Sequence, residues 1–302
     1  MNKKSFITLF LFEVICYILI GDFMLYIGSH VSFGKNDQLL GSVKEAISYN
    51  ANTFMFYTGA PQNTMRYPID KNIVKEAIEL MKENNIEYSK VIVHAPYIVN
   101  LANTEKIDYS VDFLTEEINR CNDLGIKNMV LHPGSHVGLG VEVGLNNIIN
   151  GLNRIISNTK DVVILLETMA GKGTELGTNI DEIKYIINGI KDKSRIGVCL
   201  DTCHLHDSGI DLTKFDEYLD IFDKEIGINK IHCIHINDSK NTISSHKDRH
   251  ANIGQGEIGF NTLINIIYNK RLGEIPRILE TPYIEDKAPY KEEIEMIRNK
   301  KQ

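Results

Sequence analysis

The 302-residue sequence has no tryptophan, no excess of basic charge and no low-complexity tract. Its 33 Lys and Arg are outnumbered by 40 Asp and Glu, so the composition lacks the basic charge typical of a nucleic-acid-binding domain. The sequence has five cysteines, an odd number that cannot all form disulfides with one another, and they lack the paired CxxC spacing of a zinc module. This favours free thiols in a reducing compartment, and we therefore expect a cytoplasmic protein.

A long membrane span is also missing. Residues 6–20 are nearly all apolar and follow Lys3 and Lys4, as in a signal peptide, but they number only 15 and include Glu13. A span needs about 20 apolar residues, and no small-residue cleavage site follows. The segment is a weak signal, an interfacial anchor or an upstream extension. We expect residues 1–23 to be an extension outside the fold that contributes nothing to activity, with no stable membrane partner.

The rest of the sequence alternates short apolar runs with amphipathic stretches, the pattern of βα units around a parallel sheet. Eight such runs are expected to be strands: 25–30, 53–56, 90–94, 128–132, 162–167, 196–201, 231–237 and 276–280. Seven helical patterns lie among them: 73–83, 109–124, 145–157, 180–190, 215–226, 260–268 and 291–299. Eight βα units in about 250 residues predict a (β/α)8 TIM barrel. No linker divides it, so residues 24–302 are expected to form a single α/β domain.

A doubly wound dinucleotide-binding sheet is the alternative arrangement of βα units. Its glycine motif GxGxxG should follow the first strand. The match at residues 254–259 follows a polar stretch instead of a strand, which favours a turn.

Nearly every predicted strand ends on a residue type that binds metals, and in this fold strand ends form the active site. One such residue alone would more often be a cap or a hydrogen-bonded side chain. Seven together indicate a common site: His30, His94, His132, Glu167, Asp201, His235 and Glu280.

Two loops add further donors. The motif DTCH places Asp201 and His204 on one side of a turn, and DRH places Asp248 and His250 where alternate residues of an extended loop face one ion. Mixed histidine and carboxylate sets suit zinc or manganese, and a set this large exceeds what one tetrahedral ion can use. The sequence therefore predicts two or three ions, an arrangement suited to phosphate-ester displacement.

These residues lie in stretches that closely resemble the bacterial endonuclease IV family, the zinc-dependent apurinic/apyrimidinic (AP) endonucleases of base-excision repair. The resemblance runs from Met24 almost to the C-terminus. The stretches are IGSHVS (27–32), HAPYIVNLAN (94–103), HPGSH (132–136), ETMAGKGTELG (167–177), VCLDTCH (198–204), HINDSK (235–240), DRHANIGQGEIG (248–259) and ETP (280–282).

The resemblance implies a TIM barrel with three Zn²⁺ that hydrolyses the phosphodiester 5′ to an abasic site in double-stranded DNA. The products would be 3′-OH and 5′-deoxyribose phosphate, with 3′-end trimming as a second activity, and the protein would be a monomer. The implied ligands are His94, His132 and Glu167 for one ion; Glu167, Asp201, His235 and Glu280 for the second; and His204, Asp248 and His250 for the third. A metal-bound hydroxide would be the nucleophile. Glu167 would orient it and Glu280 would assist.

The resemblance also implies which residues contact the DNA. Tyr97 stands where the family places an aromatic ring against the opened lesion. Residues 58–67 match a recognition loop in which some members carry an arginine near the middle. Here Gln62 and Asn63 occupy that region and Arg66 follows. We expect Tyr97, Gln62 and Asn63 to bind substrate.

Two other functions are compatible with parts of the pattern. A metal-dependent sugar isomerase or epimerase of the xylose-isomerase-like group shares Glu, Asp, His and Glu at strand ends, but it does not need His204, Asp248 and His250. A non-catalytic abasic-DNA binder would be expected to have lost a ligand, and none is missing. An amidohydrolase would have an HxH motif at its first strand, which is absent.

Overall fold

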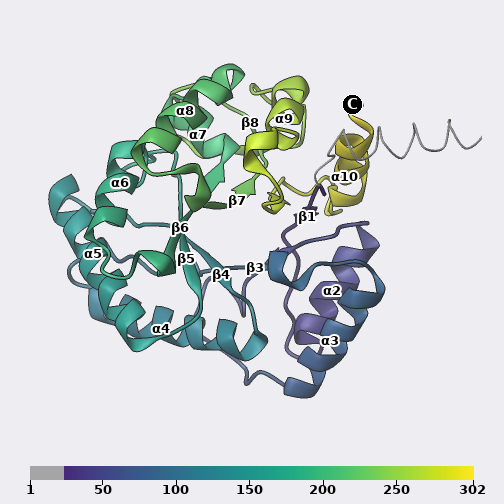
Figure 1. Ribbon diagram of the computed structural model, residues 1–302, viewed down its shortest axis with the longest axis horizontal. Coiled ribbons are helices and arrows are strands. Elements are labelled where there is room, and N and C mark those ends of the chain that lie inside the picture. Colours follow the sequence, from purple (N-terminus) through teal and green to yellow (C-terminus); the bar gives the residue numbers. More distant parts are fainter. Residues whose placement is uncertain (1–23) are drawn as a thin grey trace, which may run out of the picture.

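Eight parallel strands form the centre of the computed structural model, which describes residues 24–302 (Figure 1). They are β1 (Ile27–Ser29), β2 (Met55–Phe56), β3 (Ile92–His94), β4 (Asn128–Leu131), β5 (Val163–Glu167), β6 (Ile196–Asp201), β7 (Ile231–His235) and β10 (Arg277–Leu279). Each pairs with the next around the ring in the order β1-β10-β7-β6-β5-β4-β3-β2. The predicted (β/α)8 barrel is confirmed. The predicted extension, residues 1–23, lies outside the described residues.

Nine α-helices in the described region surround the strands (Figure 1). They are α2 (Gln38–Ser48), α3 (Lys71–Glu83), α4 (Ile107–Leu124), α5 (Val141–Asn158), α6 (Ile180–Gly189), α7 (Thr202–Ser208), α8 (Phe215–Glu225), α9 (Phe260–Ile267) and α10 (Tyr290–Asn299). In α5, buried Leu145, Ile148 and Leu152 recur at the three- and four-residue steps of an apolar helix face. None of the helices in residues 24–302 combines the length and the apolar character that a bilayer span requires.

The ring of strands closes at a seam between β1 and β2. There the two strands meet through one bridge, His30 to Met55, whereas β5 and β6 pair over four residues. Gly28 in β1 lies against the chain that enters β2. A Cβ atom on Gly28 would stand 1.8 Å from the carbonyl oxygen of Thr53, so only glycine allows the two segments to approach this closely.

Gly28→Ala is therefore expected to destabilise the barrel by about 3 kcal/mol, because the obstructing atom belongs to the backbone and cannot rotate away. This corresponds to a melting temperature lower by about 5–10 °C in a calorimetric scan. Gly34→Ala is the matched control, since a Cβ there meets nothing within 4 Å. Equal melting temperatures for the two variants would contradict the close approach.

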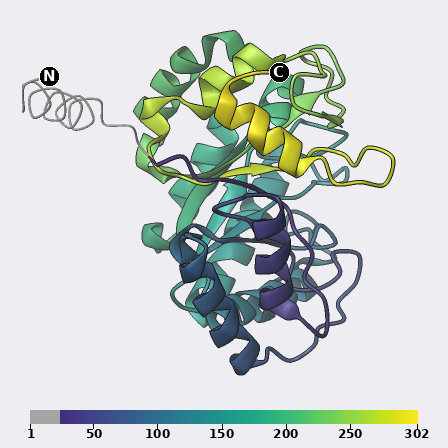
Figure 2. The same ribbon diagram turned by 90° about the vertical axis from the view of Figure 1, so that its right-hand side faces the viewer.

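The carboxyl ends of the strands meet at one end of the barrel. Figure 2 shows the yellow connection between β10 and α10 projecting at that end. A short antiparallel pair that the sequence did not predict, β8 (Asp238–Ser239) with β9 (His250–Ala251), follows β7. It fixes the chain around His250.

Candidate metal centre

The barrel interior itself positions the predicted site residues. A ring of buried side chains points inward from the strands, and side chains two residues further along a strand point the same way. Six of the ring members each lie two positions before a predicted ligand. The pairs are Ile92 and His94, Val130 and His132, Leu165 and Glu167, Cys199 and Asp201, Cys233 and His235, and Ile278 and Glu280. The buried ring therefore forms the layer of the barrel interior directly beneath the six polar side chains.

Glu167 lies at the centre of these six residues. Its Oε2 atom is 3.2 Å from Nε2 of His94 and 3.1 Å from Nε2 of His132. Its Oε1 atom is 3.0 Å from Nδ1 of His235, which is also 3.0 Å from Oε2 of Glu280. Two sets of donor atoms thus share Glu167, each within 4.8 Å: His94, His132 and Glu167; and Glu167, Asp201, His235 and Glu280.

The third set forms beside them. Asp201 caps α7, because its carboxylate accepts a hydrogen bond from the backbone N–H of His204 at 2.8 Å. The Oδ1 atom of Asp248 lies 3.1 Å from Nε2 of His204 and 3.4 Å from Nε2 of His250. The structure therefore brings all nine predicted ligands together. The local backbone differs from the extended loop that we expected, since Asp248 has a left-handed φ of 53°.

Backbone carbonyls fix the orientation of three histidine rings. The Nδ1–H group of His94 donates to the carbonyl oxygen of Ala95 at 2.7 Å. In the same way, Nδ1–H of His204 donates to Thr168 at 2.9 Å, and Nδ1–H of His250 donates to Glu280 at 3.1 Å. A carbonyl can only accept, so in the neutral ring the lone pair is on Nε2, which faces the carboxylates. Nε2 of His250 is buried and has no hydrogen-bond partner within residues 24–302. Metal-binding histidines in proteins are held in the same way, with one ring N–H bound to a carbonyl oxygen and the other nitrogen left for the metal.

Four of the nine predicted ligands are carboxylates, and their negative charges must be balanced by positive charge nearby. Burial opposes ionisation of Glu167, but the nearby His235 and His132 outweigh it and lower the pKa of that carboxyl well below its usual value. Burial likewise opposes the charged form of His204, yet the carboxylates of Asp201 and Asp248 raise its pKa well above the ordinary range. Buried carboxylates at this density need protonated histidines or metal cations beside them.

Two buried residues that the sequence analysis did not single out hold the ligands in place. Asn237 donates from Nδ2 to Asp201 (2.7 Å), and its Oδ1 accepts the N–H of Glu280 (2.9 Å), so it joins two ligands. Asp207 accepts the backbone N–H of Asp248 (2.9 Å) and the hydroxyl of Ser239 (2.6 Å). Asn237 follows His235 by two residues, just beyond the end of β7, a spacing that signals its position.

A cavity of about 590 Å³ opens beside the cluster and is lined by Glu280, His30 and Tyr57, among others. The His30 and Tyr57 rings lie 4.7 Å apart. Burial lowers the pKa of His30 to about 4, so its ring is neutral at physiological pH. The cavity gives a substrate access to Glu280.

The predicted substrate residues lie on the loops that follow β2 and β3, at the same end of the barrel. Tyr97 is 51% exposed, and Gln62 and Asn63 are also exposed. All three side chains are accessible to a large ligand, although Oδ1 of Asn63 accepts the N–H of Met65 at 2.9 Å.

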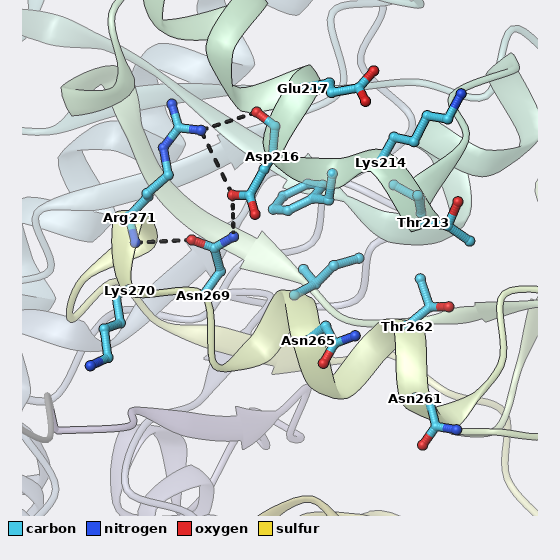
Figure 3. A pocket seen from close by; sticks show the side chains of 13 residues that line it. Thr213, Lys214, Asp216, Glu217, Asn261, Thr262, Asn265, Asn269, Lys270 and Arg271 are labelled. Atoms are coloured by element: carbon cyan, nitrogen blue, oxygen red, sulfur yellow. Dashed lines mark hydrogen bonds and ion pairs between the residues drawn. The ribbon is translucent and has the colours of Figure 1, made fainter.

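A larger cavity, about 900 Å³, lies between α8 and α9 on the outside of the barrel (Figure 3). Its polar groups are bonded to one another: Arg271 donates to the carbonyl oxygen of Asp216, and Asn269 donates to the Asp216 carboxylate. None of the nine predicted ligands lines it. The cavity is therefore separate from the metal cluster.

Comparisons with known proteins agree with this geometry. Residues 43–300 match the family model described as "Xylose isomerase-like TIM barrel". A "Probable endonuclease 4" of Acholeplasma laidlawii is 54% identical over 282 residues, which cover 92% of this chain and 96% of the relative. The "Probable endonuclease 4" of Mesoplasma florum is 49% identical, with 91% of this chain and 96% of that protein covered.

Solved structures give the same result. The crystal structure of endonuclease IV from Thermus thermophilus superposes with a TM-score of 0.77 at 27% identity, covering 91% of this chain and 98% of that one. A D-tagatose 3-epimerase-like protein has a TM-score of 0.65 at 20% identity, with 90% and 99% covered. The second similarity establishes the shared barrel only.

Proposed function

The chain belongs to the endonuclease IV family, and from this membership we propose that it hydrolyses the phosphodiester 5′ to abasic sites in double-stranded DNA. Membership makes it a DNA-repair endonuclease and a hydrolase. The finer proposal adds the products, 3′-OH and 5′-deoxyribose phosphate, a 3′-end-trimming activity, and action as a cytoplasmic monomer. The observation that carries the proposal is the convergence of nine His, Asp and Glu side chains, six at strand ends and three on the segments that follow β6 and β7.

The residues fit a cluster of three zinc ions. They supply nitrogen and carboxylate oxygen donors, both of which bind zinc, and they form more donor groups than one ion can use. The histidine lone pairs are already directed inward by backbone carbonyls. The same donors are compatible with manganese at some positions. When bound, such ions act as Lewis acids on a phosphate and lower the pKa of water.

The side chains of the protein then have separate roles. Glu167, held by four histidines, keeps its charge and joins two ligand groups. Glu280 lines the cavity through which a substrate reaches the cluster, and its carboxylate lies 3.0 Å from His235, so it would assist Glu167 at the side open to substrate. We assign Glu167 and Glu280 the catalytic roles on this basis, and Tyr97, Gln62 and Asn63 the binding of the duplex.

The sugar isomerase alternative is not favoured. The epimerase-like structures resemble this chain in fold, whereas the relatives at 49–54% identity bear the name endonuclease 4. The third group, His204, Asp248 and His250, is also fully assembled.

A cleavage assay tests the proposal. The metal-loaded protein is expected to cut a duplex with one tetrahydrofuran abasic analogue immediately 5′ to the lesion and to leave the matched intact duplex uncut. The new 3′ end should support extension by a DNA polymerase, which requires a 3′-OH. An uncut abasic duplex, together with turnover of a ketose, would instead support the isomerase.

A further inference from the structure

The third group of predicted ligands lies on segments outside the barrel strands. His204 is in α7, whereas Asp248 and His250 follow β8. The side chain of Asp248 is 30% exposed, while that of Glu167, which joins the other two groups, is only 1% exposed. The geometry of the third group therefore depends on how α7 and the segment after β8 are held together.

Asp207 joins these two segments. It lies in the last turn of α7 and is completely buried. Its Oδ1 atom accepts the hydroxyl of Ser239 at 2.6 Å, and its Oδ2 atom accepts Nδ2 of Asn241 at 3.2 Å and the backbone N–H of Asp248 at 2.9 Å. Among the nine predicted ligands, all within the described residues, this carboxylate binds Asp248 alone. Its effect is therefore directed at the third group.

The segment that carries Asp248 is attached to the end of α7 at every second residue. The N–H of Ser244 donates to the carbonyl oxygen of His206 at 3.2 Å, and the N–H of His246 donates to that of Asp207 at 3.0 Å. Ser244, His246 and Asp248 all have left-handed φ values, of 64°, 52° and 53°. Residues other than glycine keep this conformation only where their surroundings hold them. The Asp207 carboxylate is the attachment at the ligand itself.

One turn of α7 sets the separation of two ligands. His204 and Asp207 are three residues apart, so their side chains lie on the same side of the helix. Nε2 of His204 lies 3.1 Å from Oδ1 of Asp248, and Asp207 holds the backbone of Asp248 at that position. Removal of the Asp207 carboxylate would take away the acceptor of the Asp248 N–H, and Asp248 would lose its fixed place beside His204.

We propose that Asp207 is a positioning residue that sets the affinity of the third group, His204, Asp248 and His250, for its metal ion. It is not one of the predicted ligands and acts through Asp248. The inference rests on the proposed function, which supplies the ion, and adds that the third group can lose its ion while the other two keep theirs. Residues that hold metal ligands in this way contribute about 10–100-fold to metal affinity.

The experiment compares the zinc content of wild type and Asp207→Ala over a series of free zinc concentrations set by a chelator. The affinity for one ion is expected to fall about 10–100-fold, so that at intermediate free zinc the variant holds about two ions per chain and wild type about three. Asp207→Asn keeps an oxygen that can accept the Asp248 N–H, and it is expected to recover most of the lost affinity. Cleavage by Asp207→Ala should return as free zinc is raised.

Glu293→Ala is the matched control. Glu293 is a buried carboxylate with the same three kinds of donor as Asp207, namely the hydroxyl of Thr281, the amide of Asn252 and the backbone N–H of Ile253. None of these partners is a predicted ligand, so this variant should bind zinc as wild type does, even with a lower melting temperature.

Two outcomes separate this inference from the proposed function. Zinc affinities of Asp207→Ala equal to those of wild type would overturn the inference and leave the proposed function standing. Failure of wild type to bind the ions or to cut the abasic duplex would overturn the proposed function itself.

Discussion

Replacing Glu167 by glutamine is expected to reduce kcat/KM for the abasic duplex by at least about a thousandfold. The substitution keeps the shape of the side chain but removes the charge that four histidines surround. Glu167→Ala should abolish cleavage. Steady-state cleavage of the tetrahydrofuran duplex measures both effects, and circular dichroism shows whether the barrel remains folded.

Glu293→Gln is the matched control for this prediction. Glu293 is also a buried carboxylate, but its partners are the Thr281 hydroxyl and the Ile253 N–H, outside the cluster. Replacement of Glu293 should lower the melting temperature but change the rate of cleavage only slightly. Cleavage retained by a folded Glu167→Gln variant would show that the cluster does not perform the reaction.

Removing metal is expected to have the second large effect. Prolonged chelation should reduce cleavage to background and lower the melting temperature, because the binding free energy of the ions contributes to the stability of the fold. Zinc added back should restore both. Elemental analysis of the purified protein is expected to give three ions per chain. Full activity in a sample without detectable metal would contradict the assignment.

The metal-free chain should also show a distinct pH dependence. The pKa values of His132 and His204 are raised above 6.5, so their stabilising contribution is complete below pH 6.5 and is lost as the pH rises through the raised values. The pKa of Glu167 is lowered from 4.5, so its contribution is present above pH 4.5 and is lost on acidification. The lowered pKa of His30, about 4, makes stability fall as the pH drops below 6.5, so melting of the chelated protein should be highest near pH 6.5.

The barrel and the nine clustered residues could be predicted because both follow from local patterns. Strand-end positions are marked by a buried residue two places earlier, and the periodicity of two is visible in the sequence. The α7 helix was missed because seven residues are too few to show helical periodicity. The α2 helix was missed as well, since Gly41 and Ser42 interrupt its apolar pattern.

The supporting contacts could not be predicted, because they join residues that are distant in sequence. Asp207 reaches Asp248 across 41 residues, and Arg66 reaches Glu117 across 51. Nothing local to either carboxylate indicates its partner. The left-handed backbone at Asp248 could not be predicted for the same reason, since its N–H donates to Asp207 and its carboxylate contacts His204, both distant in sequence.

The seam between β1 and β2 has a mechanical consequence for the barrel. The predicted ligands Glu167, Asp201 and His235 are carried by β5, β6 and β7, and each neighbouring pair of these strands is registered over four residues. The loop of residues 58–67 leaves β2, a strand of two residues, and its Arg66 is bound to Glu117 of α4. A load on this loop is therefore passed to an outer helix and not to the strands that carry these ligands. Residues 58–67 and the metal-ligand cluster thus have separate supports in the fold, and we expect substitutions in this loop to leave the geometry of the cluster unchanged.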